Sequence, residues 1–313
     1  MKLTKNLEIL STSIKVLKKI VKKEKFSFGF DIADRCPNGC HCYWRFAQRV
    51  EEMTDEKVIN FFKKKKEEGF LNVFIIGGEP YVRPDLLEKV AGIIPITFAI
   101  TSGTVPFRHL KSSVHIVSID GKDALTHDTI RKGKNLYNRI INNLKKARQK
   151  KFPVFLHTVL NAINYTQTKN IIEVWEKNGL ADGIVFSTMT PIAGVDIEHL
   201  RLNTKQREYI VKNLLQLKSE YPAFLLNTKE MIKKLHPEVT KNYSQSKCLA
   251  KNNFIAYDAA GKEKDKCIFG ADSICSECGC VVTTMTESMN SLYGFLSALP
   301  FVMKWPYKCL NNK

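Results

Sequence analysis

The fold is decided by the segment Asp31-Ile32-Ala33-Asp34-Arg35-Cys36-Pro37-Asn38-Gly39-Cys40-His41-Cys42-Tyr43-Trp44, in which three cysteines fall within seven residues. The apolar run 26–32 that leads into it has the pattern of a buried strand. Pro37, Asn38 and Gly39 are turn formers, so the loop can curl several sulfurs around one centre. Thiolates this close together are typical ligands of zinc or of an iron–sulfur cluster, and three of them leave a coordination position open. The alternative is a set of buried cysteines that bind no metal.

A second motif follows the next apolar run. The run 72–76 (Asn-Val-Phe-Ile-Ile) reads as a short buried strand and ends in Gly77-Gly78-Glu79-Pro80. Paired glycines at the end of a strand let a ligand approach the backbone closely, and the glutamate places a charge beside it. Taken alone, the motif also fits an ordinary turn between a strand and a helix. Combined with a cysteine loop on the preceding strand, it resembles the radical S-adenosylmethionine (radical SAM) superfamily.

The resemblance implies a cofactor and a reaction. In this superfamily an iron–sulfur loop follows the first barrel strand, and a GGEP-type turn follows the second. The loop cysteines would bind a [4Fe–4S] cluster whose open iron chelates SAM. The turn would hold the methionyl end of SAM through Gly77, Gly78, Glu79 and Pro80. An electron from the reduced cluster cleaves SAM to methionine and a 5′-deoxyadenosyl radical, which takes a hydrogen atom from the substrate. An electron donor such as a flavodoxin or a ferredoxin is implied as a partner.

The cysteine spacing departs from the superfamily pattern. The usual arrangement is Cys-x3-Cys-x2-Cys, whereas this chain has Cys-x3-Cys-x-Cys, so that Tyr43 occupies the third position. We expect the ligands to be Cys36, Cys40 and Cys42, with His41 as a substitute for the third. The irregular spacing also leaves open a non-catalytic metal–thiolate binding protein.

Strands and helices alternate along the middle of the chain. The strand pattern recurs in four further apolar runs, at 96–100, 114–119, 154–160 and 183–187. Six strand–helix units in series call for parallel strands with helical crossovers, so the fold class is α/β. The resemblance implies a partial (β/α)6 TIM-like barrel over residues 26–235, with its site at the carboxyl ends of the strands. A short helix is also expected after Pro106.

Several strand ends carry turns that are similar to other motifs of the superfamily. Thr101-Ser102-Gly103-Thr104 is similar to its Thr-Asn-Gly-Thr turn, and Ser118-Ile119-Asp120-Gly121 to its Ser-Leu-Asp-Gly turn. His127-Asp128 with Arg131 and Gly133 is similar to the His-Asp-x-x-Arg-Gly segment of its peptide- and cofactor-modifying branches. The resemblance implies further SAM contacts at these ends, with the candidates Thr101, Ser102, Ser118 and Asn161. No side chain is identified as a radical relay or general base.

Five more cysteines lie in the C-terminal segment 236–313, at Cys248, Cys267, Cys275, Cys278 and Cys280. The segment resembles the SPASM and Twitch extensions of radical SAM enzymes, in which Cys-x(9–15)-Gly-x4-Cys begins an auxiliary cluster domain. Here five residues separate Gly261 from Cys267, one more than in that pattern. Five cysteines suffice for one four-thiolate [4Fe–4S] cluster. A zinc ribbon is the alternative, because Cys275-x2-Cys278 also suits zinc.

The composition is that of an ordinary globular protein with an excess of positive charge. The 313 residues are 44% hydrophobic and 26% charged, and no apolar run is long enough to span a membrane as a helix. Eight of the nine cysteines fall in two metal-site groups, which fits a reducing, cytoplasmic setting better than a disulfide scaffold. The net charge of +18 would attract nucleic acid, anionic lipid or an acidic substrate. Solvated lysine-rich helix faces explain the charge equally well, so no specific nucleic-acid partner is predicted.

Both ends of the chain are amphipathic. Residues 1–25 place apolar side chains at alternating spacings of four and three among lysines, namely Leu3, Leu7, Leu10, Ile14, Leu17 and Val21. Such a basic helix packs on the barrel or lies on a membrane surface as a peripheral contact. The apolar tail 292–310 is interrupted by Pro300 and Pro306 and is expected to dock on the domain.

A peptide, a small biosynthetic intermediate and a membrane lipid, as in hopanoid-type branches, remain the candidate substrates.

The shortened loop yields a testable prediction. Cys42→Ala should lose most of the iron of the N-terminal cluster, because two thiolates hold a cubane poorly. Tyr43→Phe is the matched control and should keep its iron, since it removes only a hydroxyl group. Iron analysis after anaerobic reconstitution measures both variants. Full cluster occupancy in Cys42→Ala would exclude Cys42 as a ligand and point to His41 or solvent.

Overall fold

A computed structural model describes residues 2–40, 49–265, 267–289 and 291–310 of the chain. Its strands are β1 (Ser27–Ala33), β2 (Asn72–Gly77), β3 (Ile96–Thr101), β4 (Ser113–Ser118), β5 (Val154–Leu160), β6 (Ile184–Thr188) and β7 (Phe254–Tyr257). Its helices are α1 (Lys2–Val21), α2 (Asp55–Glu67), α3 (Pro84–Val90), α4 (Ala124–Arg131), α5 (Leu136–Gln149), α6 (Thr168–Asn178), α7 (Thr204–Glu220), α8 (Lys229–Lys233), α9 (Pro237–Thr240), α10 (Ala250–Asn253), α11 (Val281–Ser288) and α12 (Leu292–Leu310).

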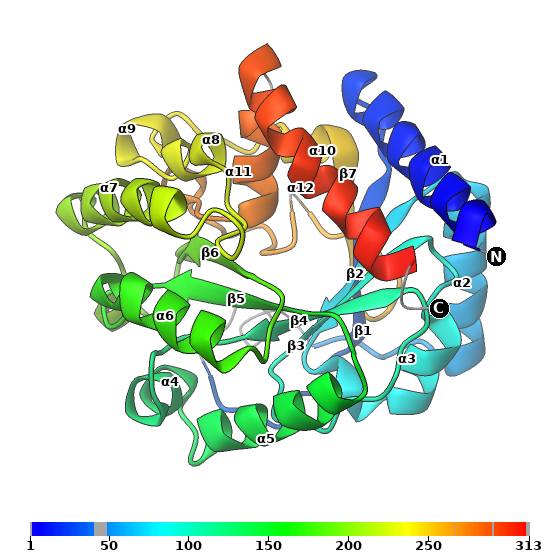
Figure 1. The fold of residues 1–313 in the computed structure, drawn as a ribbon, viewed down its shortest axis with the longest axis horizontal. Coiled ribbons are helices and arrows are strands. Elements are labelled where there is room, and N and C mark those ends of the chain that lie inside the picture. Colours follow the sequence, from blue (N-terminus) through cyan, green and yellow to red (C-terminus); the bar gives the residue numbers. More distant parts are fainter. Residues whose placement is uncertain (1, 41–48, 266, 290, 311–313) are drawn as a thin grey trace.

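All seven strands belong to one parallel sheet, in the order β6-β5-β4-β3-β2-β1-β7. The sheet curls into a half-barrel with helices on its outer side (Figure 1). The predicted α/β partial barrel is thereby confirmed. The seventh strand, β7, comes from the C-terminal segment and pairs with the free edge of β1, where Phe28 lies opposite Ile255. Because the strands are parallel, their carboxyl ends meet at one edge, and the sequence motifs of β1 to β5 meet there too.

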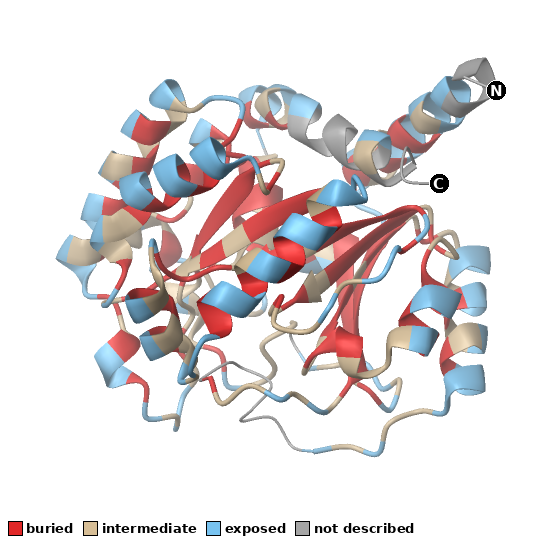
Figure 2. Cartoon of the chain, turned by 60° about the horizontal axis from the view of Figure 1, so that its bottom comes forward, coloured by how far each residue is buried: buried red, intermediate tan, exposed pale blue. Residues whose placement is uncertain are grey.

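The outer side of the sheet holds most of the apolar core. Alternate residues of a strand face opposite sides of the sheet, and Phe28, Phe30 and Ile32 of β1 pack outward against Phe62 of α2 and Leu87 of α3. A second cluster joins β4, β5 and β6 to α5, α6 and α7. Buried residues follow the strands and the inner faces of these helices (Figure 2). Each large apolar side chain contributes about 1.5–3 kcal/mol on burial, which makes these clusters the main source of stability.

Helices from both ends of the chain cover the concave side of the half-barrel. α12 contacts β3 and β4 and lies beside α1, and α11 contacts β6 (Figure 1). Val16 and Ile20 of α1, Met285 of α11 and Phe295 of α12 pack there with Phe98 of β3. The C-terminal tail therefore docks on the domain, as predicted. In the described part of the chain, no helix is both long and apolar enough to cross a membrane.

Two local predictions need correction. α1 packs on the barrel mainly through Val16 and Ile20, which lie outside the predicted stripe. Of that stripe, Leu17 is partly buried beside them, whereas Leu10 and Ile14 are 50% and 43% exposed. The concave side already holds side chains of α11 and α12, so α1 contacts it through one narrow face. No helix forms after Pro106, where residues 106–110 have no regular secondary structure. The reason is tertiary, because Phe107 of this loop packs against both outer clusters.

Gly77 and Gly78 place the end of β2 directly against the loop that follows β1. Gly77 has a φ of +113°, and a Cβ atom on Gly78 would lie 2.0 Å from the carbonyl oxygen of Arg35. The backbone N–H of Gly78 donates to the carbonyl oxygen of Ala33 (2.9 Å), and that of Glu79 donates to Arg35 (2.9 Å). These bonds extend the pairing of β1 with β2 beyond the strand ends to the first residues of the cysteine loop. The neighbouring backbone therefore requires these glycines, whether or not a ligand approaches them.

This close approach predicts that Gly78→Ala is strongly destabilising. The added methyl group would overlap the Arg35 carbonyl, and we expect the free energy of unfolding to fall by about 3 kcal/mol, the upper end of overpacking costs. Gly179→Ala is the control, because a Cβ atom there meets nothing within 4 Å. It should cost only about 1 kcal/mol, from its left-handed backbone. Urea unfolding of both variants measures the difference, and equal losses would contradict the interpretation.

Candidate functional site

The base of the cysteine loop is closed by Glu52. Its carboxylate accepts hydrogen bonds from the backbone N–H of Asp34 (2.9 Å) and from Nε and Nη2 of Arg35 (both 3.1 Å). Burial alone would raise the pKa of Glu52, but the bonds from Arg35 and from the Asp34 backbone hold that pKa below its ordinary value. Glu52 is therefore charged at neutral pH and ties the two ends of the loop together.

Arg83 supports the same region from the start of α3. Its guanidinium donates to the carbonyl oxygens of Ile32 (2.8 Å) and Met53 (2.9 Å) and pairs with Asp55 (2.6 Å). One side chain thus joins the end of β1, the segment before α2 and the start of α3. Neither Glu52 nor Arg83 was predicted, because a single charged residue outside a motif gives no signal in the sequence.

The described part of the cysteine loop lies close to the turn after β3. Sγ of Cys36 accepts a hydrogen bond from the backbone N–H of Asn38 (3.5 Å), and the Asn38 side chain reaches Oγ1 of Thr104 (3.5 Å). Burial raises the pKa of the Cys36 thiol to about 11, and the nearby Cys40 and Glu79 add to this. Such a thiol stays protonated at neutral pH unless a cation displaces its proton, which is how thiols bind metal.

The described part of the loop offers thiols, which are the kind of ligand that the predicted cluster requires. Cys40 is buried and Cys36 is half-buried. The third predicted ligand, Cys42, lies outside the described residues, as do its neighbours His41 and Tyr43. The described loop therefore offers two thiols at the edge of the sheet, next to the GGEP turn.

Glu79 is the centre of that turn and is fully buried. One carboxylate oxygen accepts hydrogen bonds from Oγ1 of Thr101 (2.7 Å) and from the backbone N–H of Tyr81 (3.2 Å). The other accepts from the backbone N–H (2.8 Å) and the hydroxyl (2.6 Å) of Ser102. All four donors are uncharged. These four bonds fix the carboxylate at the edge where β2 and β3 end.

The other predicted SAM contacts differ in how they are placed. Thr101 and Ser102 orient Glu79, and Pro80 begins the turn that follows it. Ser118 ends β4 and, by alternation along the strand, faces the concave side. The side chain of Asn161 instead turns back on its own loop, where its oxygen accepts the N–H of Ile163 at 2.9 Å.

The His127-Asp128-x-x-Arg131 segment stabilises the end of β4. Nδ1 of His127 accepts a hydrogen bond from the backbone N–H of Asp120 (3.1 Å), and Arg131 pairs with the Asp120 carboxylate (2.5 Å). Asp128 accepts the first backbone N–H groups of α5 (2.9 and 3.1 Å). Burial lowers the pKa of His127 to about 4, so the imidazole is neutral at pH 7. These contacts give the motif a structural role.

Two polar pairs on the concave side were not predicted. Asp31 of β1 pairs with Lys264 of the segment after β7 at 2.5 Å, and Nε2 of His157 on β5 lies 2.8 Å from Oγ of Ser187 on β6. Burial raises the pKa of Asp31 to about 6, although Lys264 opposes this, and burial lowers the pKa of His157 to about 4. Strand alternation places these groups on the same side of the sheet as Ser118. The two pairs become apparent only in the folded sheet, because the residues of each pair are far apart in the sequence.

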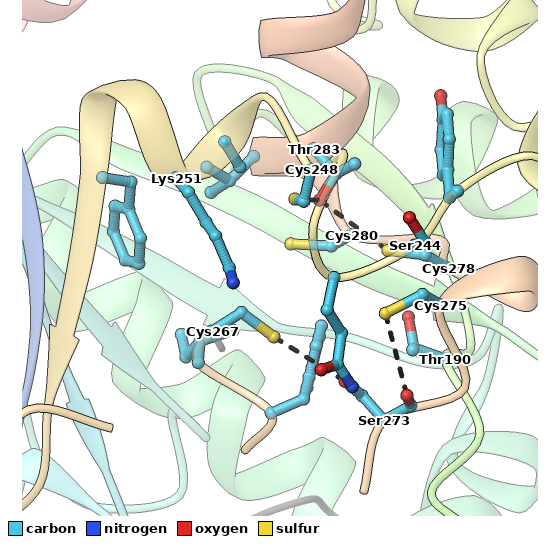
Figure 3. Close-up of a pocket in the computed structure, with 17 residues that line it drawn as sticks. Thr190, Ser244, Cys248, Lys251, Cys267, Ser273, Cys275, Cys278, Cys280 and Thr283 are labelled. Carbon is cyan, nitrogen blue, oxygen red and sulfur yellow. Dashed lines mark hydrogen bonds between the residues drawn. The ribbon is translucent and has the colours of Figure 1, made fainter. Parts of the chain in front are cut away.

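The five C-terminal cysteines line one pocket (Figure 3). Oγ1 of Thr283 lies 3.7 Å from Sγ of Cys278 and 4.0 Å from Sγ of Cys248. Sγ of Cys267 lies 3.9 Å from Oγ of Ser273. Burial raises the pKa of the Cys278 thiol to about 11 and raises that of Cys267 in the same direction. The fold therefore gathers thiols from the segment before α10, from the loop after β7 and from the segment before α11.

The donor chemistry of this pocket suits a soft metal, since buried thiols give up their protons to a bound cation. Their arrangement is not that of a closed site. In the part of the chain that the structure describes, no three His, Cys, Asp or Glu side chains are placed so as to hold a metal ion. The five cysteines therefore line one pocket, and no coordination shell is formed among the described residues.

Comparison with known proteins agrees with this geometry. Residues 31–174 match the radical SAM superfamily. The chain is 27% identical over 239 residues to a probable GTP 3′,8-cyclase of Saccharolobus solfataricus, covering 71% of this chain and 75% of that protein. Streptococcus suis SuiB bound to its precursor peptide SuiA shares the fold with a TM-score of 0.63 and 14% identity, over 85% of this chain and 67% of SuiB.

A further solved structure, native anSMEcpe with bound AdoMet, also has a TM-score of 0.63, with 14% identity over 87% of this chain and 82% of its own. At this level of identity the two structures show likeness of fold alone. The family match covers the cysteine loop, the GGEP turn and the strands that carry the other motifs. Residues 31–174 therefore form a radical SAM domain, and the protein is an enzyme.

Proposed function

We propose that this enzyme binds a [4Fe–4S] cluster through Cys36, Cys40 and Cys42, binds SAM beside it, and modifies a peptide or a small biosynthetic intermediate. When bound, the cluster and SAM supply reductive cleavage of SAM to methionine and a 5′-deoxyadenosyl radical. The protein holds the reactants in place and excludes water. A cytoplasmic flavodoxin or ferredoxin would deliver the electron.

The observation that carries this proposal is the buried carboxylate of Glu79. Four uncharged donors fix the position of the Glu79 carboxylate, and none of these donors carries a positive charge. Burying a charge is costly unless a charge of opposite sign compensates it. The ammonium group of SAM has that charge. Glu79 lies near enough to Cys36 to help raise the pKa of that thiol. An amino acid chelated to a cluster at Cys36 would therefore have its ammonium group close to Glu79.

The remaining residues take supporting roles in this proposal. Thr101 and Ser102 position Glu79 through its oxygens, while Gly77, Gly78 and Pro80 shape the turn. Ser118 is a candidate contact on the concave side. Asn161 would reach SAM only after giving up its bond to the loop of β5. The concave pairs Asp31–Lys264 and His157–Ser187 lie on the side where a substrate would meet SAM.

The comparisons favour two of the three substrate classes. The curated relative is named for a cyclase of GTP, a small molecule, and SuiB is solved with a peptide. The same chemistry on a membrane lipid is the third class. After anaerobic reconstitution, release of 5′-deoxyadenosine on reduction with SAM tests the chemistry, and added GTP or candidate peptides then test the substrate. A non-catalytic metal–thiolate protein would release none.

We propose that the C-terminal pocket holds an auxiliary [4Fe–4S] cluster, as in a SPASM or Twitch segment at residues 236–313. Its ligands would be four of Cys248, Cys267, Cys275, Cys278 and Cys280. A fully thiolate-ligated cubane has no open iron, so its work would be electron transfer or substrate anchoring. A structural zinc ribbon is the alternative.

Glu79→Gln tests the role of the buried charge. Each carboxylate oxygen accepts one backbone N–H, so either orientation of the amide sets its NH2 group against a fixed donor. We expect the free energy of unfolding to fall by about 1–3 kcal/mol, and SAM affinity in equilibrium dialysis to fall more than tenfold with iron content unchanged. Glu88→Gln, at an exposed ion pair, should change neither. A destabilised variant with normal SAM affinity would make the turn purely structural.

Replacing Cys248 and Cys267 with serine separates the two metal sites. On the assumption of two cubanes, the double variant should lose roughly half its iron. SAM cleavage without substrate should survive, because the N-terminal loop is untouched, while substrate turnover should fail. Cys36→Ser is the comparison and should abolish SAM cleavage. A double variant that keeps all its iron and loses zinc would identify a zinc ribbon instead.

A further inference from the structure

α1 carries a second apolar face that the described part of the chain does not cover. Val16 and Ile20, which are 2% and 8% exposed, pack against the barrel. Leu7, Leu10 and Ile14 lie along another side of the helix and are 58%, 50% and 43% exposed. They follow one another at helical spacing, so they form a continuous row. Single exposed apolar residues are common on protein surfaces, whereas a continuous row marks a contact site.

Positive charge borders this row. Lys15, Lys18 and Lys22 are exposed, and the helical period places Lys18 one turn beyond Ile14 with Lys15 and Lys22 along the same edge. Glu8 is the single acidic residue in the sequence of α1. A lysine stem lies along apolar surface while its ammonium group reaches a polar layer. The face is therefore apolar at its centre and basic at its rim.

The neighbouring helix extends the apolar surface. α12 lies beside α1 at one end of the molecule (Figures 1 and 2). Its residues Leu292, Tyr293 and Leu296 are 77%, 68% and 53% exposed. Two helices that contact each other, one from each end of the chain, thus both carry exposed apolar side chains.

The charge decides which partner fits this face. A second copy of the chain would bring two bodies of net charge +18 together, with lysines from both copies beside the contact. A nucleic acid would meet the lysines but would leave the apolar row without a partner. An anionic lipid surface satisfies both parts, because its headgroups attract the lysines and its acyl region takes the apolar side chains.

We propose that α1, together with the adjoining side of α12, docks the protein on an anionic membrane surface. The helix would lie in the plane of the interface, with Leu7, Leu10 and Ile14 inserted and the lysines at headgroup level. Such a contact needs no membrane-spanning helix and leaves the carboxyl edge of the sheet free. The inference is independent of the substrate of the radical SAM site.

Vesicle flotation of the full-length protein tests the proposal. The protein should float with phosphatidylcholine vesicles that contain one quarter phosphatidylglycerol, and at least tenfold less with phosphatidylcholine alone. Leu10→Ser with Ile14→Ser should reduce binding at least tenfold without lowering the melting temperature, since both side chains are exposed. Lys15→Glu, Lys18→Glu and Lys22→Glu in one chain should do the same. Lys63→Glu, Lys64→Glu and Lys66→Glu on α2 change the net charge equally and should keep most of the binding.

Three results would overturn the proposal. The first is no binding of the unchanged protein to the anionic vesicles. The second is an equal loss in the α1 and α2 lysine variants, or none in the serine variant, because binding would then follow net charge alone. The third is a dimer in size-exclusion chromatography that the serine variant dissolves while vesicles do not bind, since a second copy would then cover the face.

Discussion

The close approach of the cysteine loop to the GGEP turn is the constraint on which the rest of the site depends. Two backbone hydrogen bonds join the turn to Ala33 and Arg35, and they form only because Gly78 has no side chain. The loop base is then held by the charges of Glu52 and Arg83. A loop rich in turn formers has many conformations, and these contacts restrict it from both ends. Two motifs separate in sequence become one site through backbone geometry.

The buried carboxylate of Glu79 is held in place by uncharged groups. The four bonds to Glu79 come from the end of β3 and from its own turn, so the carboxylate joins two adjacent strands. This is a rigid arrangement, since both backbone donors belong to fixed elements. Under the proposal that the ammonium group of SAM binds here, the carboxylate would already be ordered before the ligand arrives, which lowers the cost of ordering on binding.

The C-terminal segment shares a sheet and a core with the barrel. β7 pairs with β1 beside the cysteine loop, Lys264 pairs with Asp31 on the concave side, and α12 lies on β3 and β4. A change in the C-terminal cysteine pocket therefore has a direct structural route to the strand that carries the N-terminal loop. The same docking leaves α1 with only one narrow face to bury, and so leaves Leu7, Leu10 and Ile14 exposed.

The sequence by itself determined the strands, the parallel α/β class, the two motifs and the grouping of the C-terminal cysteines, because these depend on local periodicity and short spacings. Only the tertiary structure decided which contacts the side chains make. It showed that Gly78 serves the backbone of Arg35, that Asn161 bonds its own loop, and that β7 completes the sheet. It also decided which face of α1 is buried, since an amphipathic pattern shows that an apolar face exists but not what covers it. Pairs such as Asp31 with Lys264 join residues far apart in the chain, and no local pattern encodes them.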